Sequence, residues 1–417
     1  MHHDVTRAAA RIEHNLSVRQ HRRDPLGRAV LALLDKLACS ADLGSIDLTM
    51  PAGARRTIGQ PSSAAPSVRI TRWRDLAKIA RNGALGFADA YIDGHICVED
   101  LGALFEYVLD NEAGLARLLP RLHEASREVL RYHKAHANTR SGSRRNVAAH
   151  YDLGNRFYEA WLDATMLYSS GIFRHPDDTL EMAQREKIAR IFEALDLVRG
   201  QSVLEIGCGW GQLAAEAASR GAQVKAVTIS EAQKRGAEER IAKAGLHEKV
   251  EISFEDYRDI QGVYDRVVSV EMIEAVGEEN WPGYFAMLAE RLKRDGIAVI
   301  QAITIDEGLF DHYRSNPDFI QRYIFPGGML PSVQRMAESA RLAGLRFETV
   351  ETFGPSYART LCEWRKRFEA AWPMISADQG FDERFRRMWL YYFIYCEVGF
   401  RRGFIDVGLY RLTRAER

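Results

Sequence analysis

After residue 145, short apolar runs alternate with longer stretches in which apolar residues recur at helical spacing. The apolar runs predict buried strands at 203–206, 223–229, 250–254, 264–270, 297–303, 346–352 and 406–412. The helical spacing predicts helices at 212–220, 231–244, 280–293 and 331–342. Strands that alternate with helices in this way predict an α/β fold, with a mainly parallel, seven-stranded sheet covered on both faces.

Two long helices are predicted at 359–372 and 383–402, ahead of the last strand. The second contains "RMWLYYFIYCEVGF", which is apolar on almost every side. Such a helix either lies buried in the core or forms the wall of a tunnel for a long apolar substrate. The last strand, "FIDVGLYRLTR", is expected at an edge of the sheet.

The first part of the chain lacks this alternation. Helices are predicted at 27–39, 72–81 and 101–131, and a stretch rich in Pro, Gly and Ser predicts a loop at 49–67. Polar and basic residues predict a linker at 136–145. We therefore expect a smaller, mainly helical accessory domain at 1–135, followed by the α/β domain at 146–417.

The composition is that of a soluble globular protein, with 46% apolar and 27% charged residues among 417. The five cysteines form no C-x-x-C pair, so neither a disulfide framework nor a zinc site is expected, and no metal is assigned. No apolar run is long enough to span a membrane, and the N-terminus lacks the core of a signal peptide. These features predict a cytoplasmic protein.

Positive charge is concentrated in the first part of the chain, although the formal net charge is zero. Residues 1–150 contain 22 Lys and Arg against 16 Asp and Glu, and the remainder contains 35 against 41. The surplus, which includes "RQHRR" at 19–23, indicates either contact with an anionic surface or an ordinary solvated surface. No RNA-binding pattern is visible, so a membrane is expected rather than a nucleic acid.

Three glycines follow the first strand of the α/β domain, in "VLEIGCGWGQ" at 203–212. A glycine turn between a strand and a helix lets a ligand approach the backbone and presents free N–H groups to it. The G-x-G-x-G spacing differs from the dinucleotide fingerprint, and the next strand ends in Thr228 and Ser230 instead of an acidic residue. Glu205 would repel a pyrophosphate, but it suits the amine of S-adenosylmethionine (SAM). The turn is therefore either a SAM site or an ordinary tight connection.

Several longer stretches are similar to the cyclopropane fatty acid synthase family of SAM-dependent methyltransferases. They are "RRNVAAHYDLGNRFYEAWLDATMLYSSGIF" (144–173), "VLEIGCGWGQ", "VTISEAQ", "DYRDIQGVYDRVVSVEMIEAVG" (256–277), "QRYIFPGGMLPS" (321–332) and "YARTLCEWRKRF" (357–368). "GFADAYIDGHICVEDL" (86–101) also resembles the N-terminal domain of the longer bacterial members. The resemblance implies a class I methyltransferase, or Rossmann-like, fold, in agreement with the pattern of strands and helices.

The resemblance also implies which residues bind SAM. They are Glu205, Gly207, Gly209 and Gly211 in the first loop, Thr228 and Gln233 after the second strand, Tyr168 and Ser169 in a closing segment, and Asp256 and Tyr257 beside the adenine.

The implied reaction transfers the SAM methyl group to the cis double bond of an unsaturated acyl chain in a membrane phospholipid. The double bond attacks the methyl carbon, sulfur leaves, and a cation forms on the other alkene carbon, where aromatic faces stabilise it. Removal of a proton from the added methyl closes a cyclopropane, which is the expected product. Removal from a neighbouring carbon leaves a methyl or methylene branch instead.

In the family, a bicarbonate ion is expected to accept this proton. The resemblance implies that its ligands are Glu274, Tyr357, the backbone N–H of Ile303, Ser170 and Gln301. Ser170 and Gln301 stand where the family has Cys and His; both form hydrogen bonds, but Gln does not titrate near neutral pH. The product therefore stays open between a cyclopropane, a methyl or methylene branch, and a methylated diene or furan precursor. Tyr151 and Tyr392 are expected to line the cation or lipid pocket.

Other functions also stay open. One is a SAM methyltransferase for a small metabolite or RNA, and another is a catalytically silent lipid-binding or partner-binding protein. The intact glycine turn together with Glu274 and Tyr357 argues against a silent protein. A phospholipid substrate implies a protein that docks peripherally on the inner face of the membrane, and the N-terminal domain is expected to contact either the membrane or a second copy in a homodimer.

Overall fold

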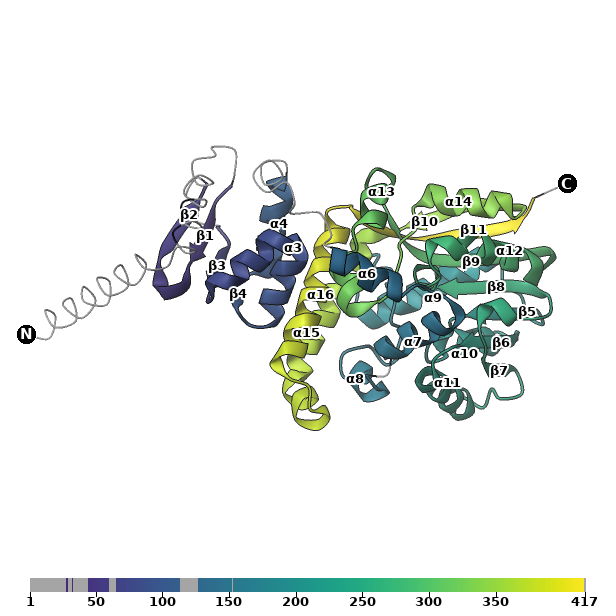
Figure 1. Cartoon of the computed structure of the whole chain (residues 1–417). Helices are drawn as coiled ribbons and strands as arrows, with labels where there is room; N and C mark the ends of the chain where they lie inside the picture. The colour runs from purple at the N-terminus through teal and green to yellow at the C-terminus, as the bar shows by residue number, and fades with distance from the viewer. Residues whose placement is uncertain are drawn as a thin grey trace, which may run out of the picture. The chain divides into compact units, whose positions relative to one another are not determined.

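The computed structural model describes residues 44–59, 65–112, 127–151 and 153–415, together with residues 28 and 32. The chain forms two compact units, Met1–Arg127 with Asp382–Tyr395, and Glu128–Phe381 with Cys396–Arg417 (Figure 1). The basic stretch at 19–23 lies outside the described residues. Most of the helix predicted at 27–39 also lies outside them, although positions 28 and 32 are described and are helical. Part of the helix predicted at 101–131 lies outside them as well.

The first unit contains a four-stranded sheet that the sequence pattern did not reveal. Its strands are β1 (Ile46–Thr49), β2 (Arg55–Ile58), β3 (Ser67–Ile70) and β4 (Ile96–Val98), in the order β2-β1-β3-β4. Only β1 and β3 run parallel. The loop predicted at 49–67 was wrong at β2, because four residues are too few for alternation to stand out in a Pro-, Gly- and Ser-rich stretch. Helices α3 (Trp73–Ile92) and α4 (Leu101–Asp110) follow two of the predicted helices.

The second unit contains the predicted seven-stranded sheet, in the order β10-β11-β9-β8-β5-β6-β7. The strands are β5 (Ser202–Ile206), β6 (Gln223–Thr228), β7 (Val250–Phe254), β8 (Tyr264–Val270), β9 (Leu292–Ile305), β10 (Leu345–Thr352) and β11 (Ile405–Arg414). The five from β5 to β9 run parallel, whereas β11 pairs antiparallel with both of its neighbours. The edge position predicted for the last strand was therefore wrong. Periodicity reports which faces of a strand are buried, but not which of its two sides is paired.

Helices lie between these strands. Six follow predicted ranges: α10 (Gln212–Ser219), α11 (Glu231–Lys243), α12 (Trp281–Arg291), α14 (Val333–Leu342), α15 (Gly354–Gln379) and α16 (Glu383–Arg401). Helix α6 (Arg127–Ala135) overlaps the end of the helix predicted at 101–131, whereas four helices were not predicted: α7 (Arg140–Tyr151), α8 (Asn155–Glu159), α9 (Leu180–Leu195) and α13 (Glu307–Ser315). Short turns η2 (Tyr257–Asp259), η3 (Ile273–Ala275), η4 (Glu278–Asn280) and η5 (Ile320–Ile324) lie between them. The linker predicted at 136–145 was wrong in its second half, because α7 begins at Arg140. Basic and polar composition suggested a linker, yet Arg is a good helix former.

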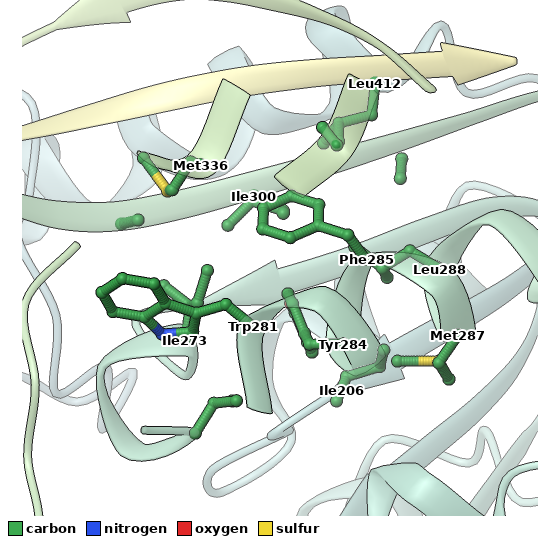
Figure 2. Close-up of a cluster of buried hydrophobic side chains, with 14 of the residues drawn as sticks. Ile206, Ile273, Trp281, Tyr284, Phe285, Met287, Leu288, Ile300, Met336 and Leu412 are labelled. Carbon is green, nitrogen blue, oxygen red and sulfur yellow. The ribbon is translucent and has the colours of Figure 1, made fainter. Parts of the chain in front are cut away.

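The main core lies between the sheet and helices α12 and α14. Figure 2 shows Trp281, Tyr284 and Phe285 of α12 beside Ile300 of β9 and Met336 of α14. All five side chains are at most 3% exposed. Packing against this core fixes β5, β8 and β9 side by side, so that the carboxyl ends of the parallel strands meet at one edge of the sheet, where open α/β sheets bind ligands.

Among the helices of the described ranges, none is both long and apolar enough to cross a bilayer.

Candidate active site

A cavity of about 160 Å³ opens at the carboxyl ends of β5, β6 and β8. Nine of the ten residues predicted to bind SAM line it: Tyr168, Ser169, Glu205, Gly207, Gly209, Thr228, Gln233, Asp256 and Tyr257. The tenth, Gly211, is the N-cap of α10. The fold therefore brings these nine residues from four separate segments of the chain around one cavity.

The glycine turn joins β5 to α10 through three residues with positive φ. Gly207, Gly209 and Gly211 have φ values of 80°, 51° and 81°, a region that other residues rarely adopt. A Cβ atom on Gly211 would lie 2.9 Å from the Cβ of Ala237 in α11, so glycine is required there for packing. A Cβ atom on Gly209 would meet no protein atom within 4 Å, so the backbone at that point is open to a ligand.

Glu205 places a buried carboxylate in this cavity. Burial raises its pKa to about 8, against a hydrogen bond from the backbone of Ala214. Its Oε2 atom has no hydrogen-bond partner among the described residues. A buried, unsatisfied acceptor is costly unless a ligand supplies a donor, and the ammonium group of SAM is such a donor. The residues present therefore fit SAM.

The remaining cofactor candidates are held by local hydrogen bonds. The Thr228 hydroxyl donates to Gln233 Oε1 over 3.0 Å, and the hydroxyl of Ser230 caps α11 by accepting from the N–H of Gln233. Asp256 pairs with Arg258, with 2.8 Å between Oδ1 and Nε. Burial would raise the pKa of Asp256, but the bonds from Arg258 hold it below its ordinary value.

Tyr257 belongs to both the cavity and the core. Its ring lies edge-on to Tyr284 of α12, with 5.6 Å between the centroids, and it lines the cavity as well. Tyr257 is therefore both a core aromatic and a candidate cofactor contact.

Three of the five residues predicted to hold bicarbonate, Ser170, Gln301 and Tyr357, donate instead to one carboxylate, that of Glu271. The side-chain amide of Gln301 donates to its Oε1 over 2.7 Å, and the backbone N–H of Ser170 donates to the same atom over 2.9 Å. The hydroxyl of Tyr357 donates to Oε2 over 2.7 Å. Because these donors are satisfied by Glu271, their arrangement does not fit a separate bicarbonate held by the same groups.

Glu274 lies one turn further along the chain, in η3. Its Oε1 accepts from the backbone N–H of Ile303 over 2.6 Å, so these two predicted residues do meet. Its Oε2 has no hydrogen-bond partner among the described residues. Burial, together with the negative charge of Glu271, raises the pKa of Glu274 to about 8.

Glu271 and Glu274 thus form a pair of half-buried carboxyl groups in unequal surroundings. Burial raises the pKa of Glu271, but hydrogen bonds from Tyr357, Ser170 and Gln301 and the positive charge of Lys187 oppose the rise. Glu274 receives only backbone donors. Of the two, Glu271 is the group whose charged form is stabilised, so it is the better proton acceptor near neutral pH.

Two residues of this site, Glu271 and Lys187, were missed in the sequence. A signal existed for Glu271, because it follows a buried strand directly and stands three residues before Glu274. It adopts a φ of +48°, uncommon for a residue with a side chain and frequent at functional sites. Lys187 gave no signal, because a single Lys in an amphipathic helix normally faces solvent.

The two tyrosines predicted for the lipid pocket stay predictions. Tyr151 is the last residue of α7, and its side chain lies outside the described part of the structure. Tyr392 is buried in α16 and packs near Trp389 and Phe393, with ring centroids 5.5 and 5.1 Å away. It belongs to the first compact unit, whereas the cavity belongs to the second.

This geometry defines a class of protein. A glycine turn after β5, a cavity at the carboxyl ends of parallel strands and an antiparallel β11 inserted beside β10 define a class I SAM-dependent methyltransferase. The family model described as mycolic acid cyclopropane synthetase matches residues 138–409, and the chain belongs to that family. The predictions of the family, the fold, a methyltransferase and SAM as methyl donor are confirmed.

Relatives match the chain over most of its length. It is 39% identical over 403 residues to tuberculostearic acid methyltransferase UfaA1 of Mycobacterium tuberculosis, covering 94% of this chain and 93% of the relative. It is 38% identical over 364 residues to cyclopropane-fatty-acyl-phospholipid synthase of Escherichia coli, covering 86% and 90%. A solved structure, mycolic acid cyclopropane synthase CmaA1 with SAH and CTAB, has a TM-score of 0.60 and 30% identity, covering 65% of this chain and 98% of that one.

Proposed function

We propose that the protein transfers the methyl group of SAM to the cis double bond of an unsaturated acyl chain in a phospholipid, with Glu271 as proton acceptor, and that the product is a methyl- or methylene-branched chain. The observation that carries the proposal is the set of three hydrogen bonds from Ser170, Gln301 and Tyr357 to the Glu271 carboxylate. The names of the relatives support the substrate class, since each acts on a fatty or mycolic acyl chain by its name.

The proposed reaction needs one proton acceptor and no other acid or base from the protein. The π electrons of the double bond form the new C–C bond to the methyl carbon, and the C–S bond breaks as its electron pair returns to sulfur. The remaining alkene carbon is left as a cation. Loss of one proton to a carboxylate then gives a neutral product, so charge and electrons balance. The half-buried ring of Tyr168 and the buried ring of Trp364, whose centroids are 5.2 Å apart, limit the access of water to this region.

The position of the base decides the product. A mobile ion can sit beside the added methyl, whereas Glu271 is tethered to the backbone just after β8 and fixed by its three donors. A tethered base reaches one place along the acyl chain. With Glu271 taking the donors expected for bicarbonate, we infer that the proton lost is not the one whose removal closes the ring. The relative named for tuberculostearic acid supports the branched product.

A cyclopropane is the second candidate product. It is favoured by the hydrogen bond between Glu274 and the Ile303 N–H, since both residues belong to the set implied by the resemblance to cyclopropane synthases. The relative from Escherichia coli carries the corresponding name.

Product analysis tests the proposal. The purified protein would be incubated with SAM and vesicles of an unsaturated phospholipid, and the released fatty acids analysed by mass spectrometry and proton NMR. Both products gain one CH2 in mass, but a branched chain initially retains a double bond and a cyclopropane shows only ring protons. Ring protons as the sole new signals would reject the branched product, and no gain of mass would reject a lipid substrate.

Variants test the base. Glu271→Gln keeps the size of the side chain and should reduce turnover by at least about 10²-fold while SAM still binds. Glu279→Gln is the matched control, because Glu279 is exposed in the neighbouring η4 turn and should retain turnover. Normal turnover by Glu271→Gln would exclude Glu271 as the proton acceptor.

The site of action belongs to the same proposal. We infer that the protein works in the cytoplasm, docked on the inner face of the membrane, and that the accessory domain predicted at 1–135 contributes basic residues to docking or contacts to a homodimer. The surplus of Lys and Arg in the first 150 residues supports docking, because each basic residue near an anionic bilayer contributes about 1 kcal/mol.

A further inference from the structure

Lys187 is a fully buried lysine in the wall of the SAM cavity. It lies in α9, and its Nζ donates to the hydroxyl of Ser169 over 2.6 Å. One turn earlier in the same helix, Gln184 donates its side-chain amide to the backbone oxygen of Ser169 over 2.9 Å. Fully buried lysines are rare unless a partner stabilises them, so this position calls for a physical reason.

The segment that α9 holds leads directly to the carboxylate of Glu271. Ser169 is followed by Ser170, whose backbone N–H donates to Glu271 Oε1 over 2.9 Å. Lys187 and Glu271 line the same cavity, and their charges interact. Lys187 therefore acts on Glu271 in two ways, through the Ser169–Ser170 backbone and through its own charge.

We propose that Lys187 is a positioning residue that holds the Ser169–Ser170 segment against Glu271 and supplies the positive charge that keeps the Glu271 carboxylate ionised for proton removal. The inference rests on the proposed role of Glu271 as proton acceptor. It goes beyond that role because it assigns the control of the base to a residue on a different element, α9.

The charged and titratable groups around the pair come from several elements. Tyr357 of α15 donates to Glu271, and Glu274 of η3 adds a second half-buried carboxyl group. Asp163, before α9, is a second acidic group whose charge acts on Lys187, and it also acts on Arg240 of α11. Asp163 is buried and Glu271 and Glu274 are half-buried, and Lys187 is the fully buried base among these three acidic groups.

Because the acidic groups outnumber the one lysine, the direction of the pKa shift of Lys187 and of Glu271 can be given. Burial lowers the pKa of Lys187 to about 8, although Glu271 and Asp163 act to raise it, so the amine still carries its proton at neutral pH. In turn, the ammonium group opposes the rise that burial causes in the pKa of Glu271. Removing the ammonium group should therefore raise the pKa of Glu271, because a nearby positive charge favours the ionised carboxylate.

The test is the pH dependence of kcat in the full chain with saturating SAM and phospholipid vesicles. The acidic limb of that profile reports the pKa of the base in the enzyme–substrate complex. Lys187→Met keeps the length of the side chain without its charge and should move the midpoint of the acidic limb up by about one unit or more, with activity recovering above the new midpoint. Lys187→Arg keeps the charge and should leave the midpoint near that of the wild type.

One control and a second neutral variant complete the test. Lys293→Met removes a half-exposed lysine that pairs with Asp265 and should not move the limb. Lys187→Gln is a second neutral variant, to be used if Lys187→Met does not fold, with SAM binding as the measure of folding. A rate that falls equally at every pH in the neutral variants, with an unmoved limb, would overturn the proposal and leave Lys187 as a structural residue.

Failure of this inference is distinguishable from failure of the proposed function. If Glu271→Gln retains normal turnover, the proton acceptor itself is wrong. If Glu271→Gln is inactive but the limb does not move in Lys187→Met, Glu271 keeps its role and only the control by Lys187 is rejected.

Discussion

Replacing Glu205 with Gln should make the protein progressively more stable than the wild type as the pH rises. Glu205 is 4% exposed, its Oε2 has no partner among the described residues, and burial raises its pKa from an ordinary 4.5 to about 8. Between those two values the folded state holds a proton that the unfolded state releases. Stability that is present at low pH is therefore lost as the pH rises through this window.

The size of the effect follows from the two pKa values. For a carboxyl group with a pKa of 4.5 in the unfolded chain and about 8 in the folded one, linkage gives a cost of about 1 kcal/mol at pH 5 and about 3 kcal/mol at pH 7. Gln has the same shape and does not titrate. The difference in unfolding free energy between Glu205→Gln and the wild type should therefore grow by about 2.5 kcal/mol from pH 5 to pH 7.

Urea unfolding without SAM, followed by tryptophan fluorescence at several pH values, measures this difference. Glu248→Gln is the control, because the Glu248 side chain is 87% exposed, and its difference from the wild type should not change with pH. The same Glu205→Gln variant should bind SAM more weakly, since the ammonium group loses its carboxylate. A difference in unfolding free energy that stays constant from pH 5 to pH 7 would refute the reasoning that Glu205 is a buried, unsatisfied acid.

Three further predictions concern the cofactor, the product and the membrane. Gly209→Val should abolish SAM binding, measured by calorimetry, because it forces a β-branched residue to a φ of 51° and fills open space in the cavity; binding by the folded variant would contradict the site. Gln301→His should shift the product towards cyclopropane in NMR of the released fatty acids, since it changes a donor to Glu271; an unchanged product would place the choice elsewhere. Binding to anionic vesicles should weaken steeply as salt rises, because the Debye length falls from about 30 Å at 0.01 M to about 10 Å at 0.1 M; binding indifferent to salt would mean apolar docking.

The local pattern of the chain was enough to predict the architecture of the second unit. Strands β5 to β11 and helices α10, α11, α12, α14, α15 and α16 follow from apolar runs and helical spacing. The Gly207–Gly211 turn follows from its position between a strand and a helix. These signals are local, because a strand, a helix or a tight turn is decided by residues close together in sequence. Parallel strands then carry their ends to one edge, which is why nine residues predicted for SAM line one cavity.

The sequence-based prediction of secondary structure was wrong where the composition of a stretch did not match the structure that it forms. The four-residue strand β2 and the first turns of α7 lie in stretches whose composition is typical of loops and linkers, and pairing or packing overrides that composition. The place of β11 between β10 and β9 depends on which strand sides are paired, and no pattern along one strand encodes this.

The sequence by itself determined the glycine turn, the order of strands and helices along the chain, and the acidic, amide and hydroxyl groups available for chemistry. Only the tertiary structure decided how those groups are used. Ser170, Gln301 and Tyr357 are far apart in sequence, and each has several possible partners until the sheet and α15 bring all three onto Glu271. Lys187 lies on another helix, and nothing along the chain links it to that carboxylate. A hydrogen bond or a charge pair depends on a distance of a few ångströms in space, and separation along the chain does not fix that distance.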